Sequence, residues 1–217
     1  MFFKFNNVSG EDWKNVINQK IYIEWLCNEH EYNRPEHLYN LTVKIVKNNH
    51  GSGLIKFFHK NKQYPLIEIA KIKFPNYRFY EWLFNEVPKN FWNDIDNQKR
   101  YMDWLGNELG YNNMEDWYNV SGNAFETNNG TSLLQKYSEL FILLKTIFLE
   151  DMWYEWKLKK VPQSFWNNMD NQKRYMDWLA KELEYTCNED WYNVSGNDFK
   201  NNYGSGLLNI YNGSPIT

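Results

Sequence analysis

The sequence is poor in cysteine and contains no long apolar run. Its two cysteines, Cys27 and Cys187, do not recur at a common spacing, so a disulfide-stapled scaffold is not expected. Scarce cysteine favours a reducing compartment, and we expect an intracellular protein of the nucleus or cytoplasm. The longest apolar stretch, Leu140–Leu149, is interrupted by Lys145 and is shorter than the roughly 18 residues of a membrane span, so no membrane partner is expected.

Basic charge and catalytic motifs are also scarce. The formal net charge is −3 and the pI is about 5.9, which is not the global basic footprint of a typical nucleic-acid-binding protein. The phosphate-binding G-x-x-x-x-G-K-S/T loop, the G-x-S-x-G elbow and the H-E-x-x-H motif do not occur. The sequence therefore predicts a non-catalytic protein with no catalytic residue and no cofactor.

Aromatic residues and an internal repeat are abundant instead. Phe, Trp and Tyr make up 19% of the chain, and because each ring can bury about 150–250 Å², small units can form sizeable cores. The segments DNQKRYMDWL and EDWYNVSGN occur in that order twice, starting at Asp96 and at Asp170, and a diverged version starts at Asn18. We therefore expect a tandem array of one unit.

The copies are too long for a simple solenoid. Equivalent tryptophans at Trp13, Trp92 and Trp166 lie 79 and 74 residues apart. Solenoid repeats span roughly 20–50 residues, so each copy is expected to be a small domain of about 75 residues. The expected boundaries are residues 1–86 for a diverged first copy, 87–160 for the second, and 161–217 for a third that ends before its last helix.

The hydrophobic period within each copy is helical. In the second copy Tyr101, Trp104 and Leu105 fall at i, i+3 and i+4, which is one face of a helix. A short helix and a glycine break are expected to follow. A final helix is then expected over Leu66–Phe74 in the first copy and over Leu140–Phe148 in the second. The sequence predicts an all-α fold built from helix-turn-helix-like units.

Two tryptophans of the repeated segment are expected in equivalent core positions. We expect Trp104 to be buried against Trp117 in the second copy. In the same way, we expect Trp178 to be buried against Trp191 in the third. Aromatic residues at helical spacing are interpreted as core first and as base-stacking platforms second.

The third copy lacks a counterpart of the final helix and of the tryptophan-rich connector that leads to the next copy. Either the chain is part of a longer protein or this end is degenerate. Without the final helix, Leu207, Leu208 and Ile210 are expected to be partly uncovered. An exposed apolar patch predicts self-association through the open third copy.

A metal site is a weak candidate. All four histidines lie in the first copy, where Cys27 and His30 form a C-x-x-H pair that could bind zinc. The other copies have no equivalent ligands, which favours solvent-facing substitutions, and no metal site is predicted. The carboxylates Asp103 and Asp177, with Glu24 as their equivalent in the first copy, recur beside a tryptophan, which favours a structural role over a catalytic one.

The repeated unit, NQKRYMDWLAKELEY followed by DWYNVS and GSGLLNIYNGS, resembles the homing-endonuclease-associated (HNH-associated) DNA-binding repeats. The matching residues are Ala180, Glu182, Leu183, Tyr211, Gly213 and Ser214 in the third copy, and Glu108, Leu109, Gly110 and Tyr137 in the second, where Ser138–Leu140 depart from the pattern. The resemblance covers roughly 45 residues per copy. It implies a DNA-binding accessory array, with any nuclease elsewhere.

Positive charge is concentrated in the first copy. Val8–Glu86 carries 11 Lys and Arg against 9 Asp and Glu, whereas each later copy is negative by three charges. Phosphate binding needs local rather than global positive charge. The candidate phosphate contacts are Lys44, Lys47, Lys56, Lys60, Lys62, Lys71 and Lys73, with a second cluster at Lys157, Lys159 and Lys160. The alternative is that these lysines form only a solvated face.

Two functions remain open from the sequence. The first is a non-catalytic nucleic-acid-binding module whose partner is duplex DNA. The alternative is a protein–protein interaction or scaffold module, in which aromatic residues of the connector and the open third copy bind a protein partner. Salt dependence distinguishes them, because only phosphate contacts impose a steep loss of affinity with salt.

Overall fold

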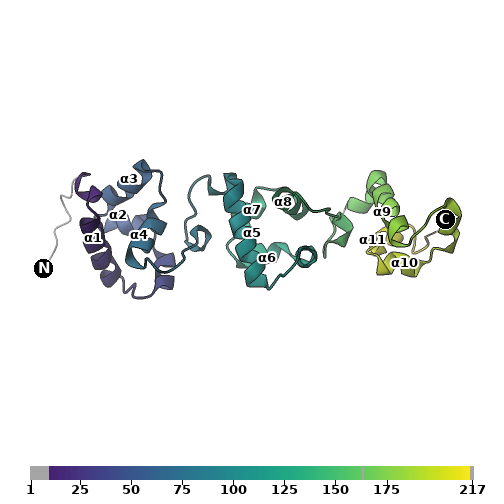
Figure 1. Cartoon of the computed structure of the whole chain (residues 1–217), viewed down its shortest axis with the longest axis horizontal. Helices are drawn as coiled ribbons and strands as arrows, with labels where there is room; N and C mark the ends of the chain where they lie inside the picture. The colour runs from purple at the N-terminus through teal and green to yellow at the C-terminus, as the bar shows by residue number, and fades with distance from the viewer. Residues whose placement is uncertain (1–9, 163, 216–217) are drawn as a thin grey trace. The chain divides into compact units, whose positions relative to one another are not determined.

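The computed structural model describes residues 10–162 and 164–215, and in these residues every regular element is a helix. The predicted all-α class is confirmed (Figure 1). The α-helices are α1 (Val16–Glu29), α2 (Val43–Asn48), α3 (Ser52–Lys60), α4 (Pro65–Lys73), α5 (Ile95–Leu109), α6 (Gly122–Thr127), α7 (Thr131–Gln135), α8 (Leu140–Ile147), α9 (Met169–Glu182), α10 (Gly196–Asn201) and α11 (Ser205–Ile210). Short 3-10 helices connect them, at Asp12–Lys14, Pro35–Asn40, Glu81–Leu83, Phe91–Asn93, Met114–Asn119, Glu155–Lys157, Phe165–Asn167 and Asn188–Asn193.

The chain divides into two compact units. One contains the described residues up to Met102 together with Phe125–Lys136, and the other contains Asp103–Ala124 together with the described residues from Tyr137 onward. In the first unit α4 lies against α1, and α3 lies against α2 and α4 (Figure 1). The final helices predicted at Leu66–Phe74 and Leu140–Phe148 are confirmed as α4 and α8.

A buried glutamine fixes the start of the long helix in each sequence copy. The side-chain amide of Gln19 donates to the backbone oxygen of Trp13 at 2.6 Å. Gln98 donates in the same way to Trp92 at 2.7 Å, and Gln172 donates to the Trp166 oxygen at 2.7 Å. All three glutamines are buried, so each amide needs a partner, and the backbone oxygen six residues earlier supplies it.

A tyrosine and a glycine are paired in the same way in each copy. The Tyr101 hydroxyl donates to the Asn128 backbone oxygen at 3.1 Å, and Tyr175 donates to the Asn202 oxygen at 2.9 Å. Two residues further along the chain from each of these asparagines lies a buried glycine. A Cβ on Gly130 would overlap the Tyr101 hydroxyl, so only glycine fits at this close approach.

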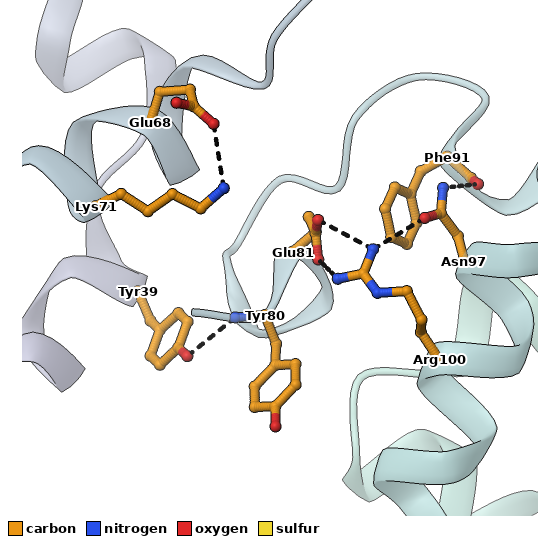
Figure 2. Close-up of polar contacts among 8 residues, drawn as sticks. All are labelled: Tyr39, Glu68, Lys71, Tyr80, Glu81, Phe91, Asn97 and Arg100. Atoms are coloured by element: carbon orange, nitrogen blue, oxygen red, sulfur yellow. Dashed lines mark hydrogen bonds and ion pairs between the residues drawn. The ribbon is translucent and has the colours of Figure 1, made fainter. Parts of the chain in front are cut away.

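The tryptophan-rich connectors pack into the core of the copy that follows them. The Trp82 ring meets the Tyr101 ring edge-on, with centroids 5.5 Å apart, and Trp156 meets Tyr175 at the same distance. Glu81, next to Trp82, is bound by Arg100 of α5 (Figure 2). The connector is therefore part of the following core and not a surface linker.

The predicted pairing of Trp178 with Trp191 is wrong. Trp178 is buried, but the connector fills its surroundings, since its nearest rings include Tyr154 and Trp156 at 5.9 and 5.6 Å. Trp191 instead packs edge-on against Tyr185. Trp104 is also less buried than predicted, with an intermediate exposure.

The predicted uncovered residues of the third copy are mostly wrong as well. Leu207 and Leu208 are only 4% and 3% exposed, because α11 packs against α10 and the Phe165–Asn167 turn. Of the three residues expected to be uncovered, Ile210 alone is exposed, at 42%. The most exposed large hydrophobic side chain described in this copy is that of Tyr192, at 83%.

Candidate nucleic-acid interface

Helices α2 and α3 of the first copy form a short helix–turn–helix. The Thr42 side chain caps α2 by accepting a hydrogen bond from the Ile45 backbone N–H at 3.1 Å. The turn between the helices contains His50 with a φ of 65°, and α3 starts two residues later at Ser52. Val46 of α2 and Leu54 of α3 are fully buried. This burial fixes which sides of the two helices remain in solvent.

Five candidate lysines lie on these solvent sides. Lys44 and Lys47 of α2 are three residues apart, and Lys56 and Lys60 of α3 are four apart, so each pair shares one face of its helix. Lys62 follows α3, and all five side chains are exposed. Within the described part of the chain none of these five lysines forms an ion pair. Their charges are therefore available to an anionic partner.

Two other candidate lysines of the first copy are neutralised locally. Lys71 pairs with Glu68 one turn earlier on α4, with Nζ and Oε1 3.2 Å apart (Figure 2). Lys73 pairs with Glu24 of α1, and its side chain is only 15% exposed. These two ion pairs reduce the local field that a phosphate would meet, so α4 is a weaker candidate than α2 and α3.

The second lysine cluster belongs to the other compact unit. The Lys157 side chain is 19% exposed and lies 3.6 Å from a Glu115 oxygen. Its Nζ also lies within 6 Å of three ring centroids, those of Tyr118, Tyr154 and Trp178. This is a structural cation–π site, worth about 0.5–2 kcal/mol. Lys159 and Lys160 are exposed. The Lys159 backbone N–H donates to the backbone oxygen of Tyr118 at 2.9 Å.

Most of the exposed positive charges on α2 and α3 have no counterpart in the other copies. The copies can be aligned on the glycine directly before α3, α7 and α11, which is Gly51, Gly130 and Gly204. In the second copy the positions of Lys44, Lys47 and Lys56 are then occupied by Asn123, Glu126 and Gln135. In the third copy they are Asn197, Lys200 and Asn209. The same backbone arrangement therefore carries a basic surface in one copy only.

A cleft beside α3 contains a basic residue that the sequence analysis missed. It has a volume of about 370 Å³, and Lys62 and Lys89 both line it together with Glu81 and Glu86. Lys89 has no periodic or motif signal, because it lies in an irregular segment and approaches Lys62 only through the tertiary fold. The mixed charge of the lining does not by itself define a phosphate pocket.

His30 and Cys27, the candidate C-x-x-H pair of the first copy, are in surroundings that do not favour metal binding. The His30 ring stacks on Tyr32 with centroids 5.5 Å apart, and its Nε2 lies 3.1 Å from the Asn49 amide nitrogen. Burial raises the pKa of the Cys27 thiol to about 11, which disfavours the thiolate that a metal ligand requires. In the described residues no group of three or more His, Cys, Asp or Glu is placed to hold a metal ion.

In the part of the chain that the structure describes, no helix has the length and apolar character needed to cross a membrane. No family model, curated protein or solved structure matches the chain.

Proposed function

We propose that the first copy is a non-catalytic nucleic-acid-binding module that contacts the phosphates of duplex DNA. The observation that supports this proposal is the set of exposed lysines on α2 and α3, which form no ion pair with any carboxylate of the described residues. Each lysine that neutralises a phosphate releases condensed counterions, which is a favourable and sequence-independent contribution to binding. Lys44, Lys47, Lys56, Lys60 and Lys62 are the proposed contacts.

The overall negative charge is compatible with this function. The second and third copies are each negative by three charges, whereas the residues before them are net positive. A charged ligand responds mainly to charges within about one Debye length, roughly 8–10 Å. The resemblance of the unit to DNA-binding repeats that accompany homing endonucleases is consistent with the same proposal. It also suggests that any nuclease is a separate domain or protein.

A charge-matched pair of variants tests the proposal. K44Q/K47Q/K56Q removes three positive charges from α2 and α3. Glutamine is a good helix former, and it already stands at the position of Lys56 in the second copy. The slope of log K against log salt should then become shallower by about 2.7, since each contact contributes about 0.9. The control K99Q/K173Q/K181Q removes three exposed charges from α5 and α9 and should leave the slope nearly unchanged.

The second candidate function is a protein-interaction module. The observation that favours it is the exposure of Tyr192 in the third copy, beside a tryptophan, Trp191, that is only partly buried. A protein that serves only this role would bind its partner with no steep dependence on salt and would have no affinity for duplex DNA.

A further inference from the structure

In the first two copies a tyrosine at the end of a 3-10 helix holds the connector that follows. The Tyr39 hydroxyl accepts a hydrogen bond from the Tyr80 backbone N–H at 3.3 Å (Figure 2). In the second copy the Tyr118 hydroxyl accepts from the Tyr154 backbone N–H at 3.1 Å. The aromatic residue just before each of these N–H donors packs edge-on against the same tyrosine, and Trp153 lies 5.1 Å from Tyr118.

The helix and connector that make these contacts have a common spacing. Phe79 lies six positions after the end of α4 at Lys73, and Trp153 lies six positions after the end of α8 at Ile147. In the second copy the residue directly after α8, Phe148, also covers Trp117 at a ring distance of 5.3 Å. With this cover, Trp117 and Tyr118 are only 6% and 8% exposed.

The third copy has the same 3-10 helix, and its described residues provide no such cover. Asp190 accepts backbone hydrogen bonds from Thr186 and Cys187 at 2.6 and 3.0 Å, as Asp116 does at the equivalent place in the second copy. Trp191 packs against Tyr185 at 5.1 Å and 83°, which matches Tyr111 and Trp117 at 5.1 Å and 78°. The local backbone and the first aromatic contact are therefore already formed.

The uncovered surface is a shallow hollow on the third copy. It has a volume of about 520 Å³ and is lined by Met176, Ala180, Trp191, Tyr192 and Val194, among others. Tyr192 is 83% exposed where its counterpart Tyr118 is 8% exposed. A large aromatic side chain in solvent beside a partly buried tryptophan is a typical site of protein interaction.

We propose that this hollow binds, from a partner protein, a segment with the chemistry of α8 and its connector. The segment is a two-turn apolar helix followed, six residues after its end, by a tryptophan or phenylalanine and then a tyrosine. The aromatic residue packs on the Tyr192 ring, and the next backbone N–H donates to the Tyr192 hydroxyl. The two occupied copies specify this occupant, because both place such a segment on the same surface.

A second copy of this chain is not the expected donor. Its own α8 buries Phe141, Leu143, Leu144 and Ile147, which are at most 5% exposed, and would have to leave its core to bind elsewhere. The proposed segment binding rests on the equivalence of the copies and not on nucleic-acid binding, so the two proposals can fail separately. Tyr192→Ala should weaken segment binding and leave the salt slope of DNA binding unchanged.

A peptide with the sequence of Ser138–Lys160 tests the proposal on the full chain. It should bind with one-to-one stoichiometry and shift the NMR signal of the Trp191 indole N–H. Tyr192→Phe removes the accepting hydroxyl and should weaken binding about fivefold, as expected for one hydrogen bond. Tyr192→Ala should weaken it more than tenfold, whereas Met169→Ala, which changes a residue that is 69% exposed and does not line the hollow, should have no effect.

A backbone change in the peptide tests the geometry. N-methylation at Tyr154 removes the donor and should weaken binding about fivefold or more. N-methylation at Glu150, whose N–H makes no hydrogen bond in the described structure, should have little effect. Three results would overturn the proposal. They are absence of binding at millimolar peptide, binding that does not depend on Tyr192, and self-association of the chain that Tyr192→Ala abolishes, which would make a second copy the occupant.

Discussion

Arg100 of α5 donates one hydrogen bond to each carboxylate oxygen of Glu81 in the preceding connector, at 3.3 and 2.8 Å (Figure 2). The guanidinium carbon also lies 5.6 Å from the centroid of the Trp82 ring. Arg174 makes the same pair of bonds to Glu155, at 3.0 and 2.8 Å, and lies over Trp156 at 5.7 Å. This bidentate, stacked arrangement needs the planar guanidinium and explains why both copies have Arg in the NQKR segment.

The first prediction concerns this ion pair. Arg100→Ala should lower the free energy of unfolding by about 2–3 kcal/mol, because the Glu81 side chain is only 9% exposed and would lose its partner. Arg100→Lys should recover only part of the loss, since an ammonium cannot bind both oxygens in the same plane. Urea unfolding of both variants measures the difference. Equal stability of Arg100→Ala and the parent would show that the pair is not structural.

The second prediction concerns the glycine that faces Tyr101. Gly130→Ala should cost about 2–4 kcal/mol of stability, because the added methyl group would overlap the Tyr101 hydroxyl and ring. Gly10→Ala, where a Cβ meets nothing within 4 Å, is the matched control and should change stability by less than about 0.5 kcal/mol. Adding Tyr101→Phe to Gly130→Ala should recover part of the loss. A purely additive double variant would contradict the proposed clash.

The third prediction concerns the two thiols. Burial is the main cause that raises the pKa of Cys27 to about 11; within that value Lys73 lowers the pKa and Glu24 raises it. Cys187 is exposed. At pH 8 a thiol reagent should modify Cys187 quickly and Cys27 only as fast as the protein unfolds. Cys187→Ser should remove the fast phase. A fast reaction that persists in this variant would show that Cys27 is accessible.

The fourth prediction concerns alkaline pH. Burial raises the pKa of Tyr22, Tyr101 and Tyr175 above the usual value of about 10. Above pH 10 the folded state therefore retains these protons while the unfolded state loses them. The contribution of these tyrosines to the free energy of unfolding is intact below pH 10 and is lost as the pH rises above it. Each tyrosine should steepen the loss by about 1.4 kcal/mol per pH unit. Tyr175→Phe should be less stable at pH 7 but should show a shallower loss above pH 10, measured by urea unfolding. An unchanged slope would contradict the argument.

The helices could be predicted because their signals are local. Tyr101 and Leu105 reveal a helical face within two turns. The contacts that organise the core are not local. The Gln98 bond to the Trp92 oxygen and the Arg100 pair with Glu81 span 6 and 19 residues and have no periodic signature.

The candidate site was predictable only as a set of charges. Composition and spacing identified Lys44 and Lys73 equally well, but one is exposed and the other pairs with Glu24, which is 49 residues away in sequence. The sequence predicts uncovered side chains at Leu207, Leu208 and Ile210, but of these only Ile210 is exposed. The exposure of Tyr192 has no signal in the sequence, because its counterpart Tyr118 is buried by tertiary contacts with the connector.

The measurement that tests nucleic-acid binding most directly is the salt dependence of duplex affinity for the parent and for K60Q/K62Q. Glutamine removes both charges without placing a carboxylate at the negative end of α3. The account predicts measurable affinity at low salt and a slope of log K against log salt that becomes shallower by about two in the variant, alike for every duplex sequence. A parent protein with no duplex affinity at low salt, or an unchanged slope in the variant, would contradict it.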